Sequence, residues 1–221
     1  MLRLILLFVA AVVLSGCDQT VSDEHPSLAK MSQRDEKLLA IAPYAKAPVP
    51  ERFRPHIVTY HREERPGTIL VDSDARYLYY VLPDGKALRY GVAVGEDGLD
   101  FSGVAQIGRK AEWPSWVPTA DIKRRMPGTP NFVGPGPQNP LGARALYLYQ
   151  NGEDTLYRIH GTNQPEYIGQ AISSGCIRMT NEAVIDLYDR VKTGAVTVVL
   201  KSRREGQASD RVPVSAREAQ S

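Results

Sequence analysis

Short runs of β-branched and aromatic residues fill the middle of the chain and predict a domain made mostly of β-strands. The pattern holds from residue 67 to residue 201, where apolar runs alternate with turn-forming glycine, proline and asparagine. The expected strands cover residues 68–71, 77–81, 88–94, 145–149, 155–160 and 196–200. Pro83-Asp84-Gly85 and Asn151-Gly152 are turn sequences, so we expect one hairpin around each. The pattern therefore predicts a single mostly-β domain over residues 67–201.

One stretch, residues 181–192, has the period of an amphipathic helix instead. Its apolar residues Val184, Leu187, Tyr188 and Val191 fall at i, i+3, i+4 and i+7, so they share one helix face. Asn181 precedes them and suits the N-cap position, with an acidic residue next in the first turn. We therefore expect one main helix, packed on the strands.

A proline-rich stretch interrupts the domain. Residues 126–140 contain five prolines and three glycines, which excludes regular structure. Both tryptophans of the protein, Trp113 and Trp116, lie shortly upstream. Long loops inside compact domains often form lids or binding walls, whereas tryptophans also fill the core beneath a loop. Both tryptophans are therefore candidates for a cleft wall, with core packing as the open alternative.

The two flanks of the domain lack its alternating pattern. Residues 17–66 are charged and broken by prolines, which indicates a flexible tether. Three of the four histidines lie in this tether and are expected to be solvated: His25, His56 and His61. Residues 202–221 are polar and charged, which is typical of a flexible tail.

The first sixteen residues have the features of a secretory signal peptide. Arg3 supplies a positive charge, and the apolar run over residues 4–14 is short for a bilayer span. The run ends in Leu14-Ser15-Gly16-Cys17, which resembles the lipobox of bacterial lipoproteins. The resemblance implies a protein on the periplasmic side of the cell envelope, anchored in the inner or the outer membrane by lipid on Cys17. The alternative is an ordinary cleaved signal followed by an unmodified Cys17.

Composition and charge narrow the choice of partner. The chain has 27 Lys and Arg residues against 25 Asp and Glu residues, and 43% of its residues are hydrophobic. The near-neutral balance argues against nucleic acid as the main partner, because such binding usually requires a basic excess. The apolar fraction is large enough to build an ordinary core.

The cysteines give the first chemical indication. Exported proteins usually pair their cysteines, so lipid on Cys17 leaves Cys176 without an intramolecular partner in an oxidising compartment. The preceding Ser173-Ser174-Gly175 is small and polar, which is an unusual setting for an inert core cysteine. The expected helix begins shortly afterwards, and its positive N-terminal end would favour a thiolate. Cys176 is therefore a candidate nucleophile.

The expected domain contains one histidine, His160, at the end of a strand. A lone histidine in such a place is more often structural. Together with the candidate thiol of Cys176, however, it provides the Cys–His arrangement that generates an activated sulfur nucleophile. One histidine and one cysteine are too few ligands for a zinc site, so we expect neither a metal nor a cofactor.

The sequence around these two residues resembles a known family. The segments His160-Gly161-Thr162-Asn163 and Ile172-Ser173-Ser174-Gly175-Cys176-Ile177-Arg178-Met179 resemble the signature of the L,D-transpeptidase catalytic domain, also called the YkuD or ErfK/YbiS/YcfS/YnhG family. The resemblance extends upstream to Asn139-Pro140-Leu141-Gly142 and to the Trp-Pro-x-Trp-x-Pro segment. It covers residues 67–200 and implies a β-sandwich-like catalytic fold.

The resemblance also implies roles for individual residues. Cys176 matches the family's nucleophile, His160 its general base, and Arg178 an arginine associated with positioning the substrate. Four neighbours are further candidates for substrate binding or for the oxyanion hole: Ser173, Ser174, Gly175 and Gly161. Backbone N–H groups around Gly175 and Cys176 would be the oxyanion donors. Many members carry histidine at the position of Ser174, so this chain departs from the usual pattern there.

The family's reaction is acyl transfer on peptidoglycan stem peptides. The cysteine attacks the carbonyl of the third residue of a stem tetrapeptide, terminal D-alanine leaves, and a thioester forms. An amine of another stem peptide, or a lysine of an envelope protein, then resolves the thioester and forms the cross-link. Two alternatives stay open: an L,D-carboxypeptidase, in which water resolves the thioester, and a non-catalytic peptidoglycan-binding lipoprotein.

Overall fold

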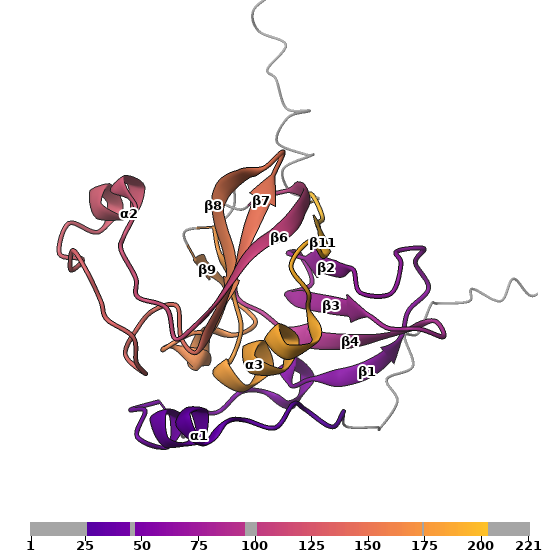
Figure 1. The fold of residues 1–221 in the computed structure, drawn as a ribbon, viewed down its shortest axis with the longest axis horizontal. Coiled ribbons are helices and arrows are strands. Elements are labelled where there is room, and N and C mark those ends of the chain that lie inside the picture. The colour runs from indigo at the N-terminus through magenta and orange to yellow at the C-terminus, as the bar shows by residue number, and fades with distance from the viewer. Residues whose placement is uncertain (1–25, 45–46, 96–100, 174, 203–221) are drawn as a thin grey trace, which may run out of the picture.

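The protein is mostly β in a computed structural model that describes residues 26–44, 47–95, 101–173 and 175–202 (Figure 1). The strands are β1 (His56–Thr59), β2 (Ile69–Asp72), β3 (Tyr77–Val81), β4 (Lys86–Gly91), β5 (Val94–Gly95), β6 (Gly103–Glu112), β7 (Arg144–Gln150), β8 (Glu153–His160), β9 (Ala171–Ser173), β10 (Ile177–Arg178) and β11 (Val196–Val199). The helices are α1 (Gln33–Ala40), α2 (Ala120–Arg125) and α3 (Asn181–Arg190), with 3-10 turns η1 (Glu51–Phe53) and η2 (Pro165–Tyr167).

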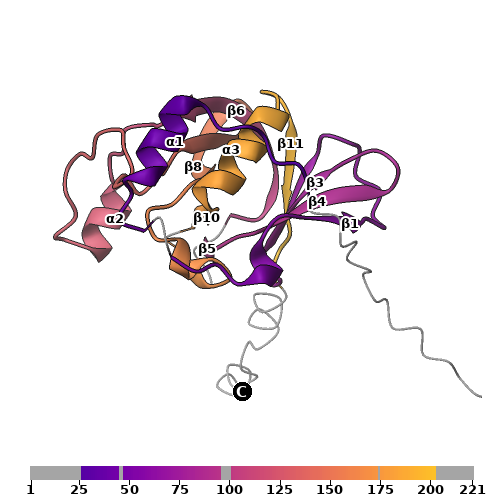
Figure 2. The same cartoon turned by 90° about the horizontal axis from the view of Figure 1, so that it is seen from below.

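The strands form one mixed nine-stranded sheet among the described residues, in the order β1-β4-β3-β2-β11-β6-β7-β8-β10, and β5 pairs with β9 separately. Strand β11 lies between the two halves of the large sheet, parallel to β2 and antiparallel to β6 (Figure 2). At the far edge β10 is parallel to β8. All other neighbours in the large sheet are antiparallel.

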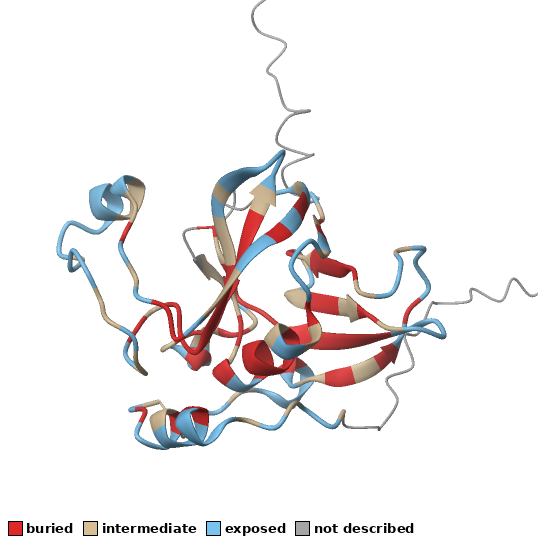
Figure 3. Ribbon diagram, in the orientation of Figure 1, coloured by how far each residue is buried: buried red, intermediate tan, exposed pale blue. Residues whose placement is uncertain are grey.

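Both halves of the sheet contribute to one apolar core. Leu78 and Leu88 come from β3 and β4, Leu146 and Ile159 come from β7 and β8, and all four are almost fully buried in the same cluster. Helix α3 adds Leu187 to this cluster. Buried positions concentrate on these strands and on α3, while α2 and the outer loops are exposed (Figure 3).

All six predicted strands are present, and so are both hairpins. The strand predicted over residues 88–94 is divided, because β4 ends at Gly91 and Val94 belongs to β5, which pairs with β9 in the separate sheet. The longest strand, β6, was not expected from the sequence. Only Ala105 and Ile107 are buried along it, because one of its faces is open and carries polar side chains. The three short strands β1, β9 and β10 were also not expected, since two to four residues show too little periodicity.

The predicted helix is α3, but its N-cap is Thr180 instead of Asn181. The Thr180 hydroxyl accepts a hydrogen bond from the backbone N–H of Ala183 at 3.2 Å. The Asn181 side chain is buried and bonds across the fold, accepting from Ala143 N at 2.8 Å and donating to Thr162 O at 2.8 Å. Asn181 therefore joins α3 to the chain that follows β8.

The segment expected to be a tether differs from that expectation in its described part. Helix α1 begins with a capping box between Ser32 and Asp35 and buries Leu39. Strand β1 pairs with β4, and His56, expected to be solvated, is buried within it. The apolar residues here do not repeat over a long stretch, yet Leu39, Ala42 and Phe53 are buried.

The lipobox with Cys17, His25 and the polar tail from residue 203 lie outside the described residues. Among the residues that are described, no helix has the length and apolar character required to cross a bilayer.

Candidate active site

A cavity of about 1180 Å³ lies at the end of β8, beneath the proline-rich loop and α2. It brings together four residues predicted from the sequence: Trp116, His160, Cys176 and Arg178. The other lining residues are Thr119, Ala120, Asp121, Ile122, Arg124, Arg125, Met126, Pro140, Leu141, Thr155, Leu156, Tyr157, Asn163, Gln164, Tyr167 and Ile172. The cavity therefore has one wall from the sheet edge and another from the loop between β6 and β7.

The parallel pairing of β8 with β10 explains how distant residues meet there. His160 ends β8, and its Cα partner on β10 is Arg178. The backbone N–H of Met179 donates to His160 O at 2.8 Å and fixes this register. Cys176 directly precedes β10, so the strand pairing carries the thiol to the end of β8 that holds the imidazole.

The imidazole of His160 is buried and held in one tautomer. Its Nδ1 lies 2.5 Å from the carbonyl oxygen of Gly161. A carbonyl oxygen only accepts, so Nδ1 carries the hydrogen and Nε2 is left with its lone pair. Burial lowers the pKa of His160 to about 3, and the nearby charge of Arg178 acts in the same direction. The resting imidazole is therefore neutral, and Nε2 is the ring nitrogen that could accept a proton.

The thiol of Cys176 is half-buried, and burial raises its pKa. A backbone hydrogen bond from Arg158 and the positive charges of Arg158 and Arg178 oppose this rise without cancelling it. The sequence favoured a thiolate because α3 begins nearby, and the raised pKa corrects that expectation. The site at rest therefore holds a neutral thiol and a neutral imidazole in the same cavity.

Arg178 is fixed by its backbone and presents its guanidinium to the cavity. Its N–H donates to Ala93 O at 2.7 Å, and Ala93 N donates back to Arg178 O at 2.9 Å. The Nη1 atom donates to Gln164 Oε1 at 3.4 Å. The guanidinium is thus a positive charge close to both the thiol and the imidazole.

Two glycines in the signature have different structural roles. Gly175 has φ of 116°, a conformation that favours glycine, directly before the cysteine. Gly161 is needed for close packing, since a Cβ there would lie 2.2 Å from Asn181 Oδ1. Ser173 ends β9, and Ser174 lies outside the described residues. Gly161 is not among the described residues that line the cavity.

The two tryptophans have different surroundings. Trp116 lines the cavity, and its backbone pairs with Val133 across the loop at 2.8 and 2.9 Å. Trp113 is only 2% exposed, and its indole N–H donates to Asp35 at 2.8 Å. The expectation of a cleft wall is therefore wrong for Trp113, because a buried polar partner draws its ring into the core.

The sequence reasoning missed several residues close to the chemistry. Arg158 bonds the thiol through its backbone and forms a bidentate ion pair with Asp154, at 2.8 and 3.0 Å. Asn181 supports the turn after His160. The basic residues Arg124 and Arg125 line the cavity from α2 and pair with an acidic residue on the same helix. Alternation along β8 could have flagged Arg158, which lies two residues before His160 and so shares its face.

The fold and the site define a class of protein: a mostly-β domain with a histidine and a cysteine in one cavity. The YkuD model, which describes the L,D-transpeptidase catalytic domain, matches residues 66–200. The chain therefore belongs to the YkuD family of L,D-transpeptidase catalytic domains.

Relatives of this family are similar over the same part of the chain. The probable L,D-transpeptidase ErfK/SrfK of Escherichia coli K12 is 36% identical over 133 residues, which are 57% of this chain and 41% of that protein. The probable L,D-transpeptidase YbiS of the same organism is 33% identical over 134 residues, covering 58% and 42%. The chain thus spans less than half the length of each of these relatives.

A solved structure from Brucella melitensis, described as a probable carnitine operon oxidoreductase, is 48% identical. It covers 68% of this chain and 94% of its own, with a TM-score of 0.47.

Proposed function

We propose that this protein is an L,D-transpeptidase that acts on peptidoglycan stem tetrapeptides through a thioester on Cys176. The observation that carries the proposal is the presence of Cys176, His160 and Arg178 in one cavity of a YkuD-family domain. The acceptor is an amine, from a second stem peptide or from a lysine of an envelope protein.

The neutral resting pair supports a defined sequence of proton transfers. As Cys176 Sγ attacks the carbonyl carbon of the third stem residue, its proton passes to Nε2 of His160. The C–N bond to D-alanine then breaks, and His160 returns the proton to the leaving amine. In the second half the acceptor amine attacks the thioester and gives a proton to His160, which passes it to the departing sulfur. Atoms and charges balance in both halves.

Each charged group in this scheme has a stabilising neighbour. The imidazolium that forms on His160 keeps its Nδ1–H bond to Gly161 O. Negative charge on the reacting carbonyl oxygen lies near backbone N–H groups around Gly175 and Cys176, and one such donor is typically worth about 3 kcal/mol. The guanidinium of Arg178 suits the carboxylates of a stem peptide.

The cavity is large enough for a peptide substrate. Its volume of about 1180 Å³ is slightly above the ~300–1,000 Å³ usual for small-molecule sites. It is lined from both the sheet edge and the loop between β6 and β7.

The test is incubation of the full-length protein with disaccharide tetrapeptide, followed by mass spectrometry. We expect dimers joined through the third residue and free D-alanine, with Cys176→Ala as the inactive control. A tripeptide product without dimers would replace the proposal with a carboxypeptidase. Unchanged substrate, with no acyl group on Cys176, would leave only a peptidoglycan-binding role.

We further propose that lipid on Cys17 anchors the protein in the cell envelope. The support is the apolar run over residues 4–14 and the Leu14-Ser15-Gly16-Cys17 sequence, which lie outside the described residues. Cys17→Ser should abolish incorporation of labelled palmitate and release the protein from membranes. Labelling that survives this change would contradict the anchor.

A further inference from the structure

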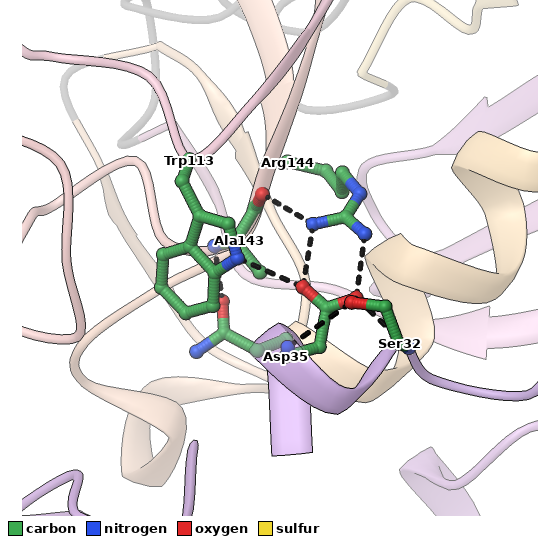
Figure 4. A network of polar contacts seen from close by, with 6 residues as sticks. Ser32, Asp35, Trp113, Ala143 and Arg144 are labelled. Atoms are coloured by element: carbon green, nitrogen blue, oxygen red, sulfur yellow. Dashed lines mark hydrogen bonds and ion pairs between the residues drawn. The ribbon is translucent and has the colours of Figure 1, made fainter. Parts of the chain in front are cut away.

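A buried carboxylate, Asp35, joins the N-terminal segment (residues 26–65) to the catalytic domain (Figure 4). Asp35 is 1% exposed and lies on α1, outside the residues that match the family. Its Oδ1 accepts from Trp113 Nε1 at 2.8 Å and from Arg144 Nη1 at 2.9 Å. Its Oδ2 accepts from Arg144 Nη2 at 2.8 Å and from the Ser32 hydroxyl at 2.7 Å. The carboxylate is therefore held by side chains from two strand ends and from its own helix.

This arrangement keeps Asp35 charged inside the fold. Burial acts to raise the pKa of Asp35, but hydrogen bonds from Arg144, Ser32 and Trp113 outweigh it and hold the pKa well below its usual range. A bidentate Arg–carboxylate pair also fixes direction as well as distance. The contact thus fixes α1 against the start of β7 in a defined direction.

One series of contacts leads from Arg144 to the imidazole of His160. Arg144 begins β7, and its carbonyl oxygen accepts from Gly161 N at 3.0 Å. The carbonyl of the same Gly161 accepts from Nδ1 of His160 at 2.5 Å. The next residue along β7, Ala145, is the Cα partner of His160 in the sheet. The backbone that orients His160 is therefore bonded to the residue that Asp35 holds.

A second series of contacts leads from Trp113 to the cavity wall. Trp113 follows β6 and has a φ of 39°, in the left-handed region. Its N–H donates to Ala143 O at 2.7 Å, and the same oxygen accepts from Arg144 Nη1 at 2.9 Å. Trp116, three residues further on, lines the cavity. Asp35 thus binds the first residue of the loop that forms this wall.

We propose that Asp35 is a positioning residue of the active site, which acts through Arg144 on His160 and through Trp113 on the wall that carries Trp116. The N-terminal segment then contributes to the geometry of the active site, although it lies outside the residues that match the family. The effect on turnover rests on the proposed function, whereas the effect on the Cys176–His160 pair does not depend on the substrate.

The chain offers a matched control in Asp186 of α3. This carboxylate is also fully buried and also binds the N-terminal segment, accepting from Ala29 N at 2.6 Å. Its other partners are Tyr90 and Arg190, on β4 and at the end of α3, away from the cavity lining. Asp35→Asn and Asp186→Asn therefore both weaken the attachment of this segment, but only the first disturbs the path to the site.

The experiment compares both variants with the unmodified full-length protein at a temperature where all are folded. Three quantities are measured: unfolding by denaturant, the pH profile of Cys176 alkylation followed by peptide mass spectrometry, and kcat and KM for tetrapeptide. We expect both variants to unfold more easily. We expect only Asp35→Asn to shift the alkylation profile and to lower kcat, by about 10- to 100-fold, since small misplacements of catalytic groups have effects of this size.

Equal changes in alkylation and kcat for the two variants, or no change for Asp35→Asn, would overturn the proposal. If Asp35→Asn does not fold, Trp113→Phe replaces it, because that change removes the indole N–H that Asp35 accepts, together with the five-membered ring, and it should alter KM more than kcat. A shifted alkylation profile in a protein that never processes tetrapeptide would support the positioning role and reject the proposed function. An unshifted alkylation profile in a protein that converts tetrapeptide would support the proposed function and reject the positioning role.

Discussion

At the scale of single residues, the site combines two opposite pKa shifts with one physical cause. Burial disfavours charge on both groups, so it lowers the pKa of His160 and raises that of Cys176. The resting pair is therefore not a thiolate–imidazolium ion pair. In the proposed reaction, charge separates only when a substrate carbonyl is present to accept electrons from sulfur.

The pair Arg158 and Asp154 should tune the thiol in opposite directions. Arg158 lowers the pKa of Cys176 and Asp154 raises it. We expect Arg158→Gln to move the midpoint of Cys176 alkylation to higher pH and Asp154→Asn to move it to lower pH. The measurement is the rate of iodoacetamide labelling at Cys176 between pH 6 and 10. Shifts of the same sign in both variants would refute this electrostatic account.

The depressed pKa of His160 also makes stability depend on pH. The unfolded histidine binds a proton near its ordinary pKa of 6.5, whereas the folded one does so only near 3. Stability from this group is complete above pH 6.5 and is lost as the pH falls toward 3. The free energy of unfolding should fall by up to about 1.4 kcal/mol per pH unit in this window. Denaturant titrations from pH 7.5 to 4.5 measure the slope.

The matched variant for this test is His160→Gln, which cannot titrate. It should be less stable at neutral pH but should have a flatter slope over the same window. An unchanged slope would assign the pH dependence to other groups.

Much of the candidate site could be predicted because its residues lie in two short segments. His160, Cys176 and Arg178 are carried by local motifs, and strand pairing brings those motifs together. Trp113 was misread because its partner Asp35 is 78 positions away, and nothing local in the sequence encodes that bond. Arg144 and Asp35, 109 positions apart, were missed for the same reason.

At the scale of elements, the prediction succeeded where one face is apolar and failed where burial is sparse. Strands β3 and β7 have dense apolar runs and were found. Strand β6 buries few of its residues, and α1 buries only Asp35 and Leu39, so neither gave a periodic signal. These elements depend on contacts that the rest of the fold supplies.

The start of α3 provides a prediction at this scale. Thr180→Ala removes a helix cap and should cost about 1 kcal/mol. Asn181→Ala keeps that cap but removes the side-chain partners of Ala143 N and Thr162 O, two buried backbone groups, and should cost roughly 2–4 kcal/mol. Thermal and denaturant unfolding of the two neighbouring variants gives the comparison. A larger loss for Thr180→Ala would mean that capping, and not the cross-fold bonds, governs this region.

At the scale of the whole molecule, the domain matched by the family packs against residues that precede it in the chain. Removing residues 26–65 would take away the carboxylate that Trp113 and Arg144 bind, and would remove β1 from the edge of the sheet. We expect the shortened chain to lose cooperative unfolding, because apolar surface packed against this segment would face water and the Arg144 ion pair would be lost. Circular dichroism during thermal unfolding measures this loss.

Addition of a peptide covering residues 26–65 is the control for that truncation, and it should restore part of the cooperative transition. Unchanged unfolding of the shortened chain would show that the N-terminal segment contributes little to stability.

The packing of the N-terminal segment also fixes how far the enzyme can travel. Ser27 already bonds Arg190, through its carbonyl oxygen at 3.1 Å, so the chain is held to the domain from there onward. With lipid on Cys17 as proposed, the residues from Cys17 to Ser27 can span at most about 35 Å, whereas a fully extended tether ending at residue 66 would span roughly 170 Å. If the anchor and the substrate are as proposed, the catalytic cavity reaches only a thin layer of cell wall next to the membrane, and stem peptides beyond that layer are out of its reach.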